Sequence, residues 1–212
     1  LNLTGYTLVA SKGDLKVSTG ALNINDATLN TSVTGSVLLS AGEGNVSSNK
    51  QTNIASGAGL EVSAAGKIDL SAAKVEYSES GALRLTAGSA DSDALKVFAH
   101  ENNTFKGAEV LLDSAGGLIF ADEAPIKVEA SSGKVVLKGQ AIDLKSGSSV
   151  KARDEAVVRG YESLVLGDKI SVEGCSVSVT GGKQAFSLGN NVSLTATNGG
   201  IEVLADADAT LG

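Results

Sequence analysis

The sequence predicts an all-β chain whose short strands stack into a β-helix, or β-solenoid, and three observations support this fold class. Apolar–x–apolar triplets recur every seven or eight residues, most regularly between residues 60 and 85. Gly, Ser, Asn and Asp fill the intervals, and these residues tolerate the backbone angles of tight corners. The β-branched residues Val and Ile together outnumber Leu, and no apolar series follows the 3.6-residue period of a helix.

The clearest triplets show which side chains should be buried. They are Leu60-Glu61-Val62, Ile68-Asp69-Leu70, Val75-Glu76-Tyr77 and Leu83-Arg84-Leu85. Because a strand alternates its side chains between two faces, each triplet should point two apolar groups inward and one charged group outward. A three-residue strand cannot be stable alone, so each triplet requires strands stacked above and below it.

The same spacing continues along nearly the whole chain. Expected strands begin near residues 1, 6, 15, 22, 29, 37, 46, 54, 60, 68, 75, 83, 95, 110, 118, 126, 135, 142, 150, 157, 164, 170, 177, 186, 192 and 201. We therefore expect one continuous rod over residues 1–212, an excerpt of a longer chain.

Two stretches depart from this regular spacing. Residues 46–54 are polar and offer only single apolar anchors. Residues 88–107 hold the only His, two of the four Phe and a run of Asp and Ser. We expect longer loops around residues 88–109 that protrude from the rod, and such loops on a rigid scaffold either carry recognition or are tolerated insertions.

Two geometries fit a spacing of about eight residues. In a single-chain right-handed parallel β-helix, three strands form one coil of about 21–24 residues. In an intertwined trimer, three copies or homologous chains contribute strands in turn, which gives a longer rod. Both bury the same apolar pairs. The even spacing with few insertions favours the trimer, homotrimeric or heterotrimeric, and the single chain is the alternative.

Composition narrows the function classes. The chain has 212 residues, 26 Gly, one Pro, no Met and no Trp, and its net charge is −7. This charge disfavours a nucleic-acid groove, which needs clustered Lys and Arg. No apolar run approaches the roughly 18 residues of a membrane span. The single Cys175 is expected to be a small structural residue with no disulfide partner in the chain.

No constellation in the sequence predicts catalysis, a metal or a cofactor. Glycan-cleaving β-helices use pairs of acidic residues, and this chain has four pairs of neighbouring acids. Each is more simply interpreted as outward, solvent-facing charges. The pairs are Asp91 with Asp93, Asp122 with Glu123, Asp154 with Glu155, and Asp206 with Asp208. His100 has no second His or Cys at ligand spacing, so a zinc site is not expected.

Two sets of residues are candidates for binding or modification. A binding loop within 88–107 would present His100, Glu101, Asn102, Asn103 and Phe105 to a surface receptor or glycan. Five sequons would be glycosylated if the protein is secreted by a eukaryote. Their asparagines are Asn2, Asn30, Asn45, Asn102 and Asn191.

The units at residues 66–77 and 81–87 resemble the octad repeats of trimeric β-helices, such as phage tail needles, type VI secretion spikes and the extracellular parts of sarcoglycans. The resemblance to filamentous-haemagglutinin-type solenoids is weaker, because Asn-x-Gly-Gly corners are scarce. The resemblance implies a non-enzymatic shaft or stalk of an extracellular, cell-surface or virion assembly. The alternatives are an adhesin that displays loops 88–107 and, more remotely, a glycan-cleaving enzyme.

Overall fold

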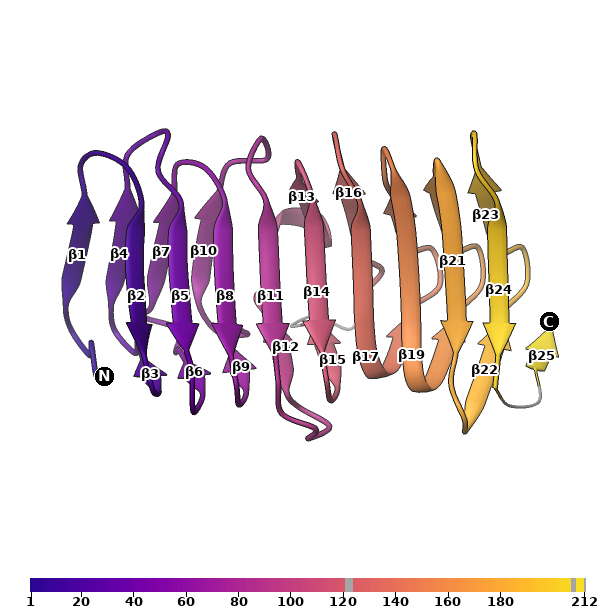
Figure 1. Cartoon of the computed structure of the whole chain (residues 1–212), viewed down its shortest axis with the longest axis horizontal. Helices are drawn as coiled ribbons and strands as arrows, with labels where there is room; N and C mark the ends of the chain where they lie inside the picture. Colours follow the sequence, from indigo (N-terminus) through magenta and orange to yellow (C-terminus); the bar gives the residue numbers. More distant parts are fainter. Residues whose placement is uncertain (121–123, 207–208, 212) are drawn as a thin grey trace.

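The chain forms a β-solenoid of nine stacked coils, as the sequence predicts. A computed structural model describes residues 1–120, 124–206 and 209–211. Figure 1 shows the coils side by side along the long axis, from the first coil on the left to the ninth on the right. Each coil contributes one strand to each of three faces. The described helical structure is a single 3₁₀ turn, Glu101–Asn103, and no described helix is long and apolar enough to span a membrane.

All described strand pairs are parallel, and each face collects the strands of one coil position. The first face holds β1 (Thr7–Ala10), β4 (Thr28–Thr31), β7 (Asn53–Ser56), β10 (Lys74–Tyr77), β13 (Thr104–Gly107), β16 (Lys127–Ala130), β18 (Ser149–Lys151), β20 (Ser171–Gly174) and β23 (Ser193–Ala196). The second face holds β2 (Leu15–Thr19), β5 (Val37–Ala41), β8 (Leu60–Ala64), β11 (Leu83–Ala87), β14 (Val110–Ser114), β21 (Ser176–Gly181), β24 (Ile201–Ala205) and the first halves of β17 (Val135–Leu144) and β19 (Glu155–Leu166). The third face holds β3 (Leu22–Asn23), β6 (Val46–Ser47), β9 (Ile68–Asp69), β12 (Leu95–Val97), β15 (Leu118–Phe120), β22 (Ala185–Leu188), β25 (Ala209–Leu211) and the second halves of β17 and β19.

The register shows that the coils belong to one chain. Along the second face the aligned residues are Leu15, Val37, Leu60, Leu83, Val110, Val135, Ala156, Val177 and Ile201. Each coil is therefore 21 to 27 residues long. The described ladders join strands of the same chain. This arrangement is the single-chain parallel β-helix that the sequence left as the alternative. The favoured intertwined trimer is not this arrangement, because in a trimer the neighbouring strand would come from another copy.

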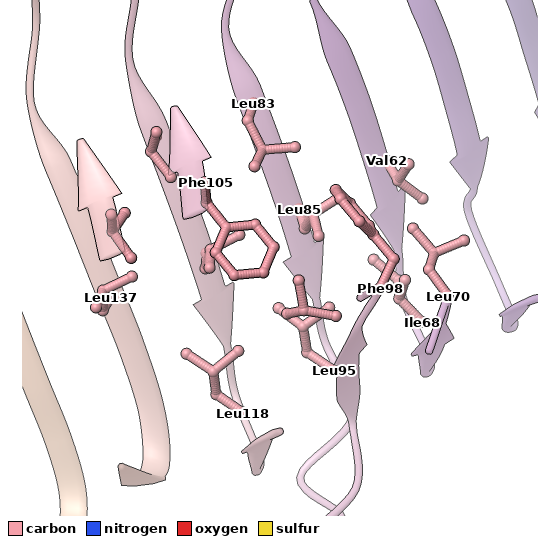
Figure 2. Packing of buried hydrophobic residues seen from close by; sticks show 14 of the residues in the cluster. Val62, Ile68, Leu70, Leu83, Leu85, Leu95, Phe98, Phe105, Leu118 and Leu137 are labelled. Carbon is pink, nitrogen blue, oxygen red and sulfur yellow. The ribbon is translucent and has the colours of Figure 1, made fainter. Parts of the chain in front are cut away.

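The core consists of inward columns that run through the coils. The side chains of Leu60, Val62, Leu83 and Leu85 are all 0% exposed. The side chain of Glu61, which lies between Leu60 and Val62 in the sequence, is exposed to solvent. Figure 2 shows such side chains from several strands meeting inside the coils. The buried residues form one connected cluster from the first coil to the eighth. The predicted inward and outward positions of these triplets are therefore confirmed.

Short polar side chains shape one of the corners. After the third-face strands, Asn2 accepts a hydrogen bond from the backbone N–H of Thr4, at 3.1 Å. Asp69, at the end of the third-face strand β9, accepts a hydrogen bond from the N–H of Ser71 in the same way, also at 3.1 Å. Such Asx turns satisfy backbone donors where the ladder ends. The polar run 46–54 keeps its predicted anchors, because Val46 and Ile54 are 1% and 0% exposed.

The second face is continuous, but the other two faces are interrupted. On the first face β10 and β13 are not paired with each other, and on the third face β15 is not paired with β17. A pocket of about 450 Å³ lies at the third-face interruption, and Leu118, Ile126 and Ile142 line part of it. Both interruptions lie next to coils that carry longer connections.

Outward charges of opposite sign often face each other in neighbouring coils. Arg84 lies 3.7 Å from Glu61 and 2.6 Å from Glu109, the next coil on either side. On the first face, Lys151 lies 3.3 Å from Glu173. Because like charges directly opposite each other destabilise a sheet, this alternation favours one register of the coils.

Candidate functional site at residues 88–107

The segment predicted to protrude forms two separate loops. Residues 88–94 make the corner between β11 and β12, and residues 98–103 make the corner between β12 and β13. Between them β12 lies inside the third-face sheet, paired with β9 and β15. The coil that contains both loops, from Leu83 to Val110, is the longest of the solenoid. The two loops therefore emerge at different corners of the rod.

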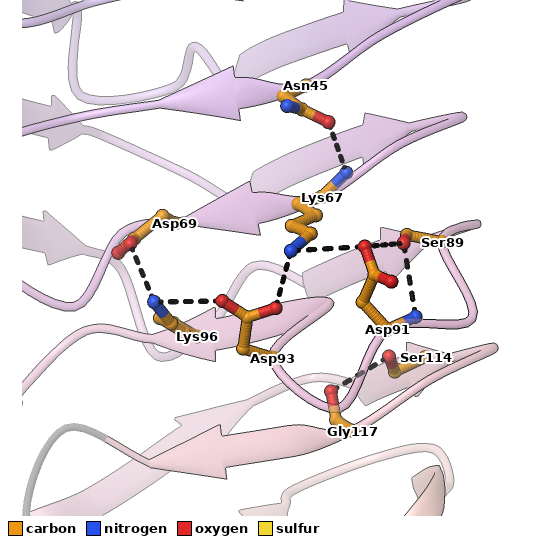
Figure 3. A network of polar contacts seen from close by, with 9 residues as sticks. All are labelled: Asn45, Lys67, Asp69, Ser89, Asp91, Asp93, Lys96, Ser114 and Gly117. Carbon is orange, nitrogen blue, oxygen red and sulfur yellow. Dashed lines mark hydrogen bonds and ion pairs between the residues drawn. The ribbon is translucent and has the colours of Figure 1, made fainter.

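The first loop is held to the rod by a chain of alternating charges, drawn in Figure 3. The ammonium group of Lys67 lies 2.6 Å from a carboxylate oxygen of Asp93 and 3.0 Å from one of Asp91. The ammonium group of Lys96 lies 3.3 Å from both Asp93 and Asp69. These contacts join β9, the loop and β12 across two coils. The arrangement orders the loop on the surface.

The network shifts the acid–base equilibria of its members in the direction expected for ion pairs. Hydrogen bonds from Lys67 and then Lys96 lower the pKa of Asp93, and those from Lys67 and Ser89 lower the pKa of Asp91. The pKa of Lys67 is raised by Asp93 and Asp91. All of these groups are exposed to solvent, so the pairs contribute little stability each.

Backbone hydrogen bonds hold the same loop between the preceding and the following coil. The N–H of Gly117 donates to the carbonyl of Asp91 at 2.8 Å, and the N–H of Gly88 donates to Ala64 at 2.9 Å. A Cβ atom at Gly116 or Gly117 would overlap the backbone of the loop. Glycine is therefore required at this close approach.

An aromatic cluster fills the space where β10 and β13 are unpaired. The ring centroids of Phe98 and Phe105 are 5.7 Å apart, and those of Tyr77 and His100 are 5.4 Å apart with nearly parallel planes. Phe105 also contacts Phe120, at 5.6 Å. Five of the chain's eight Phe, Tyr and His side chains meet here. Large rings replace the missing ladder with buried area and edge-to-face contacts.

The hydroxyl of Tyr77 has no partner that meets hydrogen-bond geometry among the described residues. Burial raises the pKa of Tyr77, and the nearby backbone of Lys106 offsets this effect only in part. This buried hydroxyl without a partner marks the interruption as a departure from the regular solenoid.

The predicted binding residues separate into exposed and buried groups. Glu101 and Asn102 are exposed on the 3₁₀ turn, while His100 and Asn103 are half-buried. Asn102 and Asn103 both adopt positive φ angles, 51° and 50°, which Asn tolerates better than most residues. Phe105 is only 1% exposed, so it belongs to the core and a partner cannot reach it in this structure.

The five sequon asparagines all have exposed side chains: Asn2, Asn30, Asn45, Asn102 and Asn191. Two of them also have structural roles. The side-chain oxygen of Asn45 accepts a hydrogen bond from the backbone of Lys67 at 2.7 Å, and that of Asn2 accepts one from the Thr4 hydroxyl at 2.6 Å. Exposure makes each site accessible to modification.

The other acids form no common site. Asp91 and Asp93 are ion-paired with Lys67, and Asp154 and Glu155 are exposed at a corner. Three further candidates, Asp122, Glu123 and Asp208, lie outside the described residues. Within the described part of the chain, no three His, Cys, Asp or Glu side chains gather closely enough to hold a metal ion. Cys175 is a free, half-buried thiol.

The segment therefore offers a polar 3₁₀ turn anchored on a rigid aromatic base, an arrangement suited to recognition. Comparison with known proteins finds no matching family model, no matching curated protein and no matching solved structure.

Proposed function

We propose that this chain is a rigid, non-enzymatic shaft that separates or stiffens parts of an extracellular, cell-surface or virion assembly. One observation carries the proposal: the second-face ladder runs without interruption through nine coils, over one connected core. At about 4.8 Å per coil, this stack is about 40 Å long. Each coil contacts only its neighbours, so length can change by whole coils without a new core.

Removal of one whole coil should shorten the rod and leave it folded. Deletion of residues 37–59 would place Leu60 opposite Leu15 and β10 beside β4, so that apolar columns meet apolar columns. We expect cooperative thermal unfolding and a maximum dimension about 5 Å shorter in small-angle X-ray scattering.

Deletion of about half a coil, residues 37–48, is the matched control. It removes the second-face strand β5 and the third-face strand β6 but keeps β7, so the first-face strand β4 would lead directly into another first-face strand, and we expect loss of cooperative unfolding. If both deletions unfold alike, coils are not interchangeable units and the shaft proposal fails.

The second candidate function is adhesion through the turn at residues 98–103. The observation in its favour is the aromatic base that holds this turn where the first-face ladder is interrupted. Deletion of the whole segment 88–107 would remove β12 and two buried Phe, so substitution is the better experiment.

The double variant Glu101→Ala/Asn102→Gly should keep the melting temperature within about 2 °C, because both side chains are exposed. If the turn is adhesive, the wild-type protein should bind to a printed glycan array and the double variant should not. The control Glu79→Ala/Ser80→Gly changes exposed residues of another corner. Absence of wild-type binding, or equal binding by both variants, would count against adhesion through this turn.

A further inference from the structure

The outer surface of the second face carries an exception to the alternation of charge. In the register of β17 and β19, Lys138 lies directly opposite Arg159. The neighbour of Lys138 on its other side is Asp113, and the neighbour of Arg159 is Thr180. Among the described residues, neither cation has a carboxylate within ion-pair distance. Two residues of like charge thus lie in adjacent coils, on strands whose backbones are about 4.8 Å apart.

Asp113 faces Lys138 from the preceding coil without an ion pair, and two other acids near the pair are engaged in hydrogen bonds elsewhere. Glu162 accepts hydrogen bonds from Gln140 at 2.9 Å and from Gln184 at 3.3 Å. Glu202 accepts one from the Ser178 hydroxyl at 3.2 Å. Because opposed like charges in a sheet repel, an external anion between them would be stabilising.

Apolar and aromatic groups lie beside the cations. Leu111, Val136 and Val157 are register neighbours that point outward from three successive coils. Val136 is only 4% exposed, while Leu111 and Val157 are partly exposed. These residues form a flat aliphatic strip along the axis of the rod, parallel to the row of cations.

Tyr161 completes the surface at the corner that follows Arg159. The guanidinium carbon of Arg159 lies 4.9 Å from the centroid of the Tyr161 ring, and the side chain of Tyr161 is 39% exposed. This cation–π contact fixes both groups. A shallow groove of about 340 Å³ crosses the same surface, and its lining includes Lys138, Val157 and Arg159 as well as Glu155 and Glu202.

We propose that this surface binds an acidic polysaccharide that lies along the rod. Carboxylate groups of the sugar chain would pair with Lys138 and Arg159, and the apolar faces of the sugar rings would pack on Val157 and Tyr161. The coil spacing of about 4.8 Å is close to the length of one pyranose unit, so successive sugars can meet successive coils.

The test uses polygalacturonate as the probe and its fully methyl-esterified form as the neutral counterpart, with titration calorimetry on the full chain. We expect binding of the acidic polymer, no binding of the ester, and affinity that falls as salt is added. The double variant Lys138→Gln/Arg159→Gln should weaken binding at least tenfold. Lys12→Gln/Lys50→Gln, which removes two exposed lysines elsewhere, should bind as the wild type does.

Three outcomes would overturn the proposal. They are no binding of polygalacturonate at millimolar sugar concentration, equal loss in the two double variants, and tighter binding of single-stranded DNA or poly-glutamate than of the polysaccharide. Circular dichroism and melting temperature verify that each variant is folded. The outcome is independent of the shaft proposal, which the coil deletions test.

Discussion

Replacement of Leu70 by Asp should disrupt the third and fourth coils. Leu70 is 0% exposed, and its backbone N–H donates to the carbonyl of Lys96 at 3.0 Å. Figure 2 shows its side chain among the apolar groups of β9 and its neighbours. A carboxylate at this position would lose its hydration, and no described cation lies in the core to pair with it. We expect a loss of more than about 4 kcal/mol in the free energy of unfolding.

The control for this variant is Ala72→Asp, which adds the same charge two residues away on an exposed corner. Its free energy of unfolding should change by less than about 0.5 kcal/mol. Both values come from urea denaturation followed by circular dichroism. An unchanged unfolding midpoint for Leu70→Asp would falsify the inward assignment of this column.

The local unit of the fold could be predicted from sequence because a strand has only two faces. The triplet Leu83-Arg84-Leu85 satisfies this alternation in any β-helix, and both leucines are indeed fully buried. The corners could also be predicted, because the backbone preferences of Gly, Asn and Asp for tight turns are local. These features depend on a few adjacent residues, and the sequence displays them directly.

The choice between one chain and three could not be made in this way. Leu60 packs beneath an apolar neighbour in either geometry, so the burial pattern is the same. The structure decides through register: Leu60 pairs with Val37 and Leu83 of its own chain. Register depends on coil length, which varies from 21 to 27 residues with the corners, and no local pattern encodes it.

The position of the longer loops at residues 88–107 could be predicted from sequence, but their internal arrangement could not. The unusual composition of residues 88–107 indicated a departure from regular coils. The division of this segment between two corners follows from the pairing of β12 with β9 and β15. Partners from outside the segment complete the site: Lys67 from the preceding coil, Tyr77 from β10 and Phe120 from β15. Such long-range contacts become visible only once the coils are aligned.

Replacement of Phe105 by Ala should cost about 3–5 kcal/mol, because it leaves a cavity at the point where the first-face ladder is interrupted. Phe105 is 1% exposed and contacts Phe98, His100 and Phe120. Backbone hydrogen bonds join the other successive strands of the first face, but between β10 and β13 the aromatic cluster takes their place. Loss of its central ring should therefore loosen both flanking strands.

Hydrogen exchange at residues 74–77 and 104–107 measures this effect locally. The matched control is Phe186→Ala in the eighth coil, where Phe186 is 2% exposed and its strand is paired with both neighbours. We expect faster exchange in β10 and β13 for Phe105→Ala and unchanged exchange there for Phe186→Ala. Each coil contacts only its neighbours, so a defect three coils from β13 and four coils from β10 does not reach this point. If the two variants accelerate exchange in β10 and β13 equally, the rod loosens as a whole and the aromatic cluster has no special role in bridging the interruption.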